Sequence, residues 1–201
     1  MTNKLALCAP LALALAACAT ASDRNRGADI ESVQAERELD FPTYDEDSVL
    51  NEAKNVFGEA SAEISEVIAD VFAREGRPQA YIAGEEAGGA VGVGATYGKG
   101  LLYRPDQAPV EVYWQGPSVG FDLGADASEV FALVYDLGET DNLYRRFPGA
   151  EGNVFVIGGV AAEYLRTDGI TVVPVRTGVG ARAGVNVGYM NFTRDRKVLP
   201  F

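Results

Sequence analysis

The 201-residue chain contains no histidine and only two cysteines, Cys8 and Cys18, both near its N-terminus. The absence of histidine removes the commonest general base and the commonest metal ligand. Two cysteines in these positions provide neither a disulfide framework nor a thiolate metal cluster. Most templates for hydrolases are therefore excluded, while Ser/Lys or carboxylate-only catalysis stays open. We expect a protein without catalytic residues, metal or cofactor.

Positive charge is also scarce. The net charge is −12, and the acidic excess is concentrated between residues 23 and 70. A nucleic-acid-binding surface needs a basic patch, and an anionic membrane surface would repel such an acidic chain. The composition therefore predicts no nucleic-acid partner.

The first residues have the pattern of a secretory signal peptide, with Lys4, an apolar run over residues 5–17 and then small residues. The run is too short to span a bilayer as a mature helix. The letters "LAAC", ending at Cys18, resemble the lipobox of bacterial lipoproteins, in which the cysteine is diacylated. They favour a signal peptide over residues 1–17 and lipid attachment at Cys18. The competing site is "ATA", ending at Ala21, which would leave a soluble periplasmic protein.

The residue after the predicted lipidated cysteine is Ala19 and not aspartate. By resemblance to Gram-negative lipoproteins, this implies anchoring in the outer membrane, on its periplasmic side, through acyl chains that insert stably. Residues 18–47 are polar and acidic with few aromatics, which predicts a disordered tether. Residues 48–201 then form a single domain.

Apolar residues between Ser48 and about Ala73 recur at spacings of three and four, which predicts one amphipathic α-helix. Gly76 and Pro78 would end this helix. Gly58 weakens it by about 1 kcal/mol relative to alanine, so a break at this position stays open. The opposite face of the helix is acidic, which is unlike a helix that lies on a membrane surface.

After about residue 80 the apolar period changes to two, and turn-forming stretches such as "RPDQAP", "GADAS" and "RTDG" interrupt it. This pattern predicts a mainly β fold, a small antiparallel β-barrel of about eight strands with one N-terminal amphipathic α-helix packed on it. The clearest hairpin turns at Asp168-Gly169. The segment "VYWQGPSVGFDLGADASEVFALVYDL", residues 112–137, is predicted to form two barrel strands joined by a tight turn.

Most glycines fall on one face of these strands, at even positions in "GGAVGVGATYGKGLLY" and "GVGARAGVNVGY". Thr96, Ser118, Asp122, Arg182 and Asn186 have the same parity and are our candidates for a ligand-binding or structural face. Glycine in a strand often marks the close approach of another surface. That surface is either the helix or a ligand, and we expect the helix because its apolar stripe must be buried.

Other motifs have ordinary structural explanations. "GVGATYGKG" lacks the first glycine and the Ser/Thr of a phosphate-binding loop. Asp122 and Asp126 are better explained by turn formation than by a carboxylate pair. Trp114, the only tryptophan, is expected in the core. Arg145-Arg146 is more typical of a solvated pair than of a site for anionic headgroups.

Five segments resemble the bacterial envelope integrity protein A family in order along residues 79–201. They are "YIAGEEAGGAVGVGATYGKGLLY", "VYWQGPSVGFDLGADAS", "LVYDL", "NLYRRFPG" and "RTGVGARAGVNVGY". The resemblance implies a small periplasmic β-barrel of about eight strands that supports envelope integrity without known catalysis. A more distant likeness to SYLF lipid-binding domains rests on Trp114, Pro117 and Gly124.

Together these observations predict a non-enzymatic, lipid-anchored periplasmic protein that binds an envelope component, a lipid or a polysaccharide. The alternative is a lipid or amphiphile carrier with an apolar pocket inside the barrel. A barrel interior filled by side chains would favour the first hypothesis, and a hollow one the second.

Overall fold

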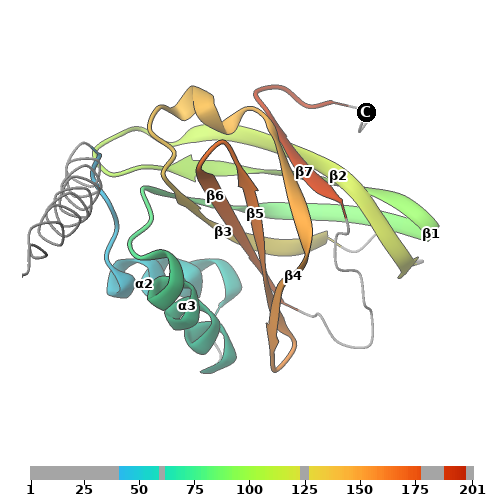
Figure 1. The fold of residues 1–201 in the computed structure, drawn as a ribbon, viewed down its shortest axis with the longest axis horizontal. Helices are drawn as coiled ribbons and strands as arrows, with labels where there is room; N and C mark the ends of the chain where they lie inside the picture. The colour runs from blue at the N-terminus through green and yellow to red at the C-terminus, as the bar shows by residue number, and fades with distance from the viewer. Residues whose placement is uncertain (1–40, 59–61, 123–126, 178–187, 198–201) are drawn as a thin grey trace, which may run out of the picture. The chain divides into compact units, whose positions relative to one another are not determined.

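The computed structural model describes residues 41–58, 62–122, 127–177 and 188–197, with the backbone alone at 89–93, 118–122, 127 and 150–153. Its described strands close into an antiparallel barrel, with two helices beside it (Figure 1). The strand order around the barrel is β1-β2-β7-β4-β5-β6-β3. The strands are β1 Ala80–Tyr103, β2 Val110–Asp122, β3 Ala127–Tyr135, β4 Arg146–Ile157, β5 Val160–Thr167, β6 Ile170–Arg176 and β7 Tyr189–Thr193. The predicted small antiparallel β-barrel is confirmed.

The predicted hairpin joins β5 and β6. Thr167 pairs with Ile170, and Asp168 and Gly169 both have positive φ, at 49° and 83°. A two-residue turn with both central residues at positive φ matches the twist of the flanking strands. The prediction of the turn at Asp168-Gly169 is therefore confirmed.

The strands β2 and β3 follow each other in sequence but do not pair within the described residues. Strand β2 pairs with residues 90–102 of β1 and with β7. Strand β3 pairs with residues 80–87 of β1 and with β6. The prediction of two barrel strands in this segment holds, but they lie on opposite sides of β1 and do not form a hairpin. The alternation of side chains along a strand does not determine which other strands it pairs with.

The single predicted helix is two helices, α2 Glu46–Phe57 and α3 Ala62–Glu75. Gly58 lies between them with φ 77° and ψ −147°, a conformation that is available almost only to glycine. The side chain of Asp45 caps α2 by accepting a hydrogen bond from Ser48 N at 2.9 Å. The helix α2 therefore begins at Glu46, ahead of Ser48, where we expected the helix to begin.

Two apolar clusters hold this arrangement together. The inner cluster fills the described barrel interior with side chains from all seven strands, including Ile82, Trp114, Leu165 and Phe192. The outer cluster joins the apolar faces of both helices to the outside of β1, β3, β5 and β6. Its members include Val67, Ile68, Tyr81, Phe131, Leu133 and Val173.

The glycine face is not covered by the helices, so our expectation is wrong for the part of that face that is described. It has the parity of Ile82 and Leu102 and points into the barrel. Strand β1 doubles back, and a Cβ on Gly84 would lie 2.2 Å from the carbonyl oxygen of Lys99. A Cβ on Gly100 would lie 2.5 Å from the carbonyl oxygen of Ala83. The glycines let the two halves of β1 contact each other.

Candidate functional site

A buried ionic cluster lies on the inward faces of β1, β5 and β6. Arg176 Nε donates to Glu86 Oε1 at 2.6 Å and its Nη2 to Oε2 at 3.3 Å. Arg176 Nη1 lies 3.5 Å from Glu163 Oε2. The side chains of Arg176, Glu86 and Glu163 are only 13%, 10% and 7% exposed. One guanidinium therefore compensates two carboxylates in a place that water barely reaches.

Burial and ion pairing shift the pKa values of this cluster in opposite directions. Burial raises the pKa of Glu163, and the charge of Arg176 lowers it, with the raised pKa as the result. Burial also opposes the charge on Arg176, but Glu86 and Glu163 hold its pKa above the ordinary value. Arg176 thus stays charged, and Glu163 takes up a proton more readily than an exposed glutamate does.

Trp114 is hydrogen-bonded to this cluster. Its Nε1 donates to Glu86 Oε2 at 3.2 Å, and the residue is 2% exposed. Its ring lies directly against Gly98, where an added Cβ would be 1.9 Å from Cε2. The predicted core position of Trp114 is confirmed, and a glycine on the neighbouring strand makes room for its ring.

A groove of about 440 Å³ opens beside this tryptophan. Its lining combines aromatic, acidic and basic side chains from β1, β2 and the segment after β7. The lining residues are Glu85, Glu86, Ala87, Tyr97, Gly98, Lys99, Glu111, Tyr113, Trp114, Gln115, Arg196 and Lys197. Tyr113 Oη donates to Glu111 Oε1 at 2.5 Å, and this hydrogen bond raises the pKa of Tyr113. The groove is the concave, chemically mixed surface at which a ligand would find several partners.

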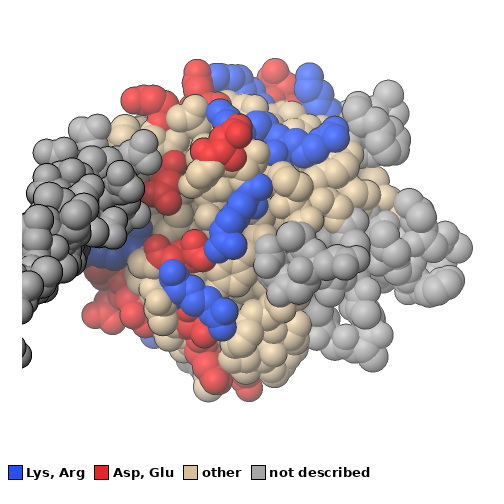
Figure 2. All heavy atoms as spheres, viewed as in Figure 1, with Lys and Arg blue, Asp and Glu red and all other residues tan. Residues whose placement is uncertain are grey.

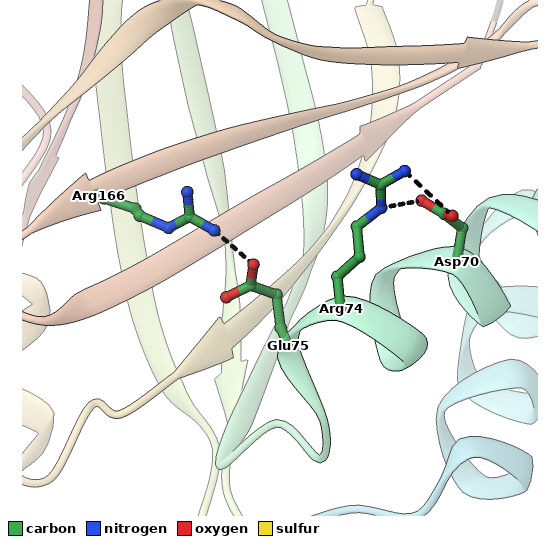
Figure 3. A network of polar contacts seen from close by, with 4 residues as sticks. All are labelled: Asp70, Arg74, Glu75 and Arg166. Atoms are coloured by element: carbon green, nitrogen blue, oxygen red, sulfur yellow. Dashed lines mark hydrogen bonds and ion pairs between the residues drawn. The ribbon is translucent and has the colours of Figure 1, made fainter.

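On the face drawn in Figure 2, Lys and Arg side chains lie among Asp and Glu side chains. Figure 3 shows two ion pairs near the end of α3, Arg74 with Asp70 and Arg166 with Glu75. The Arg74 Nε to Asp70 Oδ2 distance is 2.6 Å. Exposed pairs of this kind contribute little to stability because solvent screens them.

Arg145 and Arg146, which we expected to be a solvated pair, have partners within the fold. Arg145 Nη1 donates to Asp168 Oδ2 at 2.9 Å, and the guanidinium of Arg146 lies 4.1 Å from the centre of the Tyr189 ring. The two side chains therefore hold neighbouring segments of the barrel.

The structure brings together part of the predicted face. Thr96 is buried and pairs with Gly116, Ser118 is opposite Gly94, and Asp122 is opposite Ala90. These three positions share one face of the β1–β2 ladder. The side chains of Ser118 and Asp122, and all of Arg182 and Asn186, lie outside the described residues.

Sequence reasoning missed the cluster of Glu86, Arg176 and Glu163. A signal was present for Glu86, which has the same even parity as the glycines that follow it. Nothing in the sequence indicated that Arg176, 90 residues away, would be its partner. Among the residues that the structure describes, no group of histidine, cysteine or acidic side chains is arranged to hold a metal ion.

Comparison with known proteins defines the family. A family model described as envelope integrity protein A matches residues 42–201. The chain belongs to the envelope integrity protein A family. A crystal structure of an uncharacterised β-barrel-like protein from Brucella abortus is 40% identical, with a TM-score of 0.72, and the match covers 79% of this chain and 99% of that one. No curated protein matches the chain.

Family membership supports a role in the cell envelope. The comparisons do not show the more distant likeness to SYLF domains. No helix within the described ranges has the length and apolarity needed to cross a membrane.

Proposed function

We propose that this member of the envelope integrity protein A family supports the cell envelope as a non-enzymatic lipoprotein, anchored in the outer membrane through Cys18. In this proposal the barrel binds a component of the envelope in the groove beside Trp114. The observation that supports it is the groove itself, which places aromatic rings and charged groups of both signs around one opening.

The inner cluster favours this function over that of a lipid carrier. A carrier needs an empty apolar space for acyl chains. In the described part of the barrel, large side chains such as Phe147, Leu102, Val112 and Met190 fill the interior, all at most 4% exposed. Binding at the groove requires no such space.

The test uses an added side chain that blocks the groove. Ala87 lines the groove and is exposed, so Ala87→Tyr introduces bulk there without disturbing the core. Ala108 is exposed and outside the groove, which makes Ala108→Tyr the matched control. Both full-length variants are expressed in a strain that lacks the protein, and resistance to detergent is measured at equal protein levels.

Wild type and Ala108→Tyr should restore resistance, whereas Ala87→Tyr should not, although its thermal unfolding remains like that of the wild type. Full restoration by Ala87→Tyr would show that the groove is not needed for the envelope role.

A further inference from the structure

The walls of the groove carry both signs of charge in nearly equal number. Glu85 and Glu111 are exposed acids, and Lys99, Arg196 and Lys197 are exposed bases. The third lining acid, Glu86, is already compensated by the guanidinium behind it. The groove therefore offers partners to an anion and to a cation within the same opening.

This balance discriminates between classes of envelope ligand. A polyanion, such as a phosphorylated glycolipid, would meet the groove acids and the overall net charge of −12, and long-range repulsion would oppose its approach. A neutral glycan would use neither set of charges. A ligand with an ammonium and a carboxylate close together satisfies both sets through charge-assisted hydrogen bonds.

The aromatic residues of the groove add a flat apolar component. Tyr97, Tyr113 and Trp114 line it together. The hydrogen bond from Trp114 to Glu86 at 3.2 Å fixes the indole, and Glu86 is in turn fixed by Arg176 at 2.6 Å. Trp114 is only 2% exposed, so the half-buried rings of Tyr97 and Tyr113 are the aromatic surface that the apolar face of a sugar ring would contact. The volume of about 440 Å³ lies in the range of about 300–1,000 Å³ typical of small-ligand sites.

We propose that the groove binds peptidoglycan through a zwitterionic muropeptide unit, an amino-sugar ring with its attached stem peptide. In this arrangement Lys99, Arg196 and Lys197 face stem-peptide carboxylates, Glu85 and Glu111 face the ammonium group of the diamino acid, and Tyr97 and Tyr113 face the sugar. The assignment rests on the proposed function and names its ligand.

The chain reports on this site directly because Trp114 is its only tryptophan. A disaccharide-tetrapeptide that contains diaminopimelate, released from sacculi by a muramidase, is titrated into the full chain while tryptophan fluorescence is recorded. We expect a saturable change that is absent with the neutral disaccharide and that weakens with added salt.

Two charge reversals identify the chemistry of the ligand. Lys99→Glu reverses one of the basic lining residues, and Glu85→Lys reverses one of the acidic ones. Each substitution should weaken binding at least tenfold. Lys54→Glu and Glu66→Lys make the same charge changes on exposed helical positions outside the groove and should leave binding unchanged. Thermal unfolding confirms that all four variants are folded.

Tighter binding by Glu85→Lys would indicate a polyanion, and indifference to both reversals would indicate a neutral glycan; either result overturns the assignment. Lipopolysaccharide and phosphatidylethanolamine vesicles are titrated in parallel. A response to one of these that Ala87→Tyr abolishes, without a response to the muropeptide, would refute the assignment and keep the groove function. No response to any of the three would refute the assignment, and complementation by Ala87→Tyr would then decide separately whether the groove is needed.

Discussion

Removal of the buried guanidinium is the most demanding test of the barrel interior. In Arg176→Leu the carboxylates of Glu86 and Glu163 lose their partner, while they remain 10% and 7% exposed. Breaking a buried ion pair by removing one partner costs about 3–5 kcal/mol, because the remaining charge stays buried and uncompensated. For a domain of this size each 1 kcal/mol shifts Tm by about 2–4 °C, so Tm should fall by about 6–20 °C.

The assay is thermal unfolding at pH 7, followed by circular dichroism. Arg166→Leu is the control, because Arg166 pairs with Glu75 but its side chain is 51% exposed, and its loss should cost at most about 1 kcal/mol.

A triple variant distinguishes the stability lost through uncompensated charge from the stability lost through poorer packing. Adding Glu86→Gln and Glu163→Gln to Arg176→Leu removes both uncompensated charges, so most of the lost stability should return. The reasoning is refuted if Arg176→Leu lowers Tm no more than Arg166→Leu, or if the triple variant is less stable than the single one.

Three further outcomes follow from the same structure and sequence. Because burial raises the pKa of Glu163, its contribution to stability is greatest below its ordinary pKa and declines as the pH rises through the raised value. The difference in Tm between Glu163→Gln and wild type should therefore increase in favour of the variant from about pH 4 to pH 8, and a constant difference would contradict this. Gly98→Ala places a methyl group 1.9 Å from the Trp114 ring; it should cost about 1–3 kcal/mol and shift tryptophan emission, and unchanged emission would mean that the ring had not moved. Cys18→Ser should abolish labelling by a fatty-acid analogue, and equal labelling of variant and wild type would refute lipidation at this residue.

Local chemistry was sufficient to predict several parts of the fold. The period of two with regular turn stretches predicted the antiparallel barrel, and Asp168-Gly169 predicted the turn from β5 to β6. These features depend on the backbone preferences of a few adjacent residues. The break between the two helices also depends on local backbone preference, since Gly58 was the weak position in the helical pattern. The sequence alone does not show whether Gly58 is tolerated within one helix or ends it, because packing decides between these two outcomes.

The orientation of the glycine face was decided by the tertiary structure. Alternation shows which residues share a face, but it contains no information about which face turns inward. Only the return of β1 upon itself, which brings Gly84 against Lys99 and Gly100, explains the glycines there. The ionic cluster depends on tertiary structure for the same reason. Glu86 and Arg176 are 90 residues apart in sequence and meet because β3 pairs with both of their strands. Sequence determined the elements and their turns, whereas closure of the barrel determined which side chains became buried together.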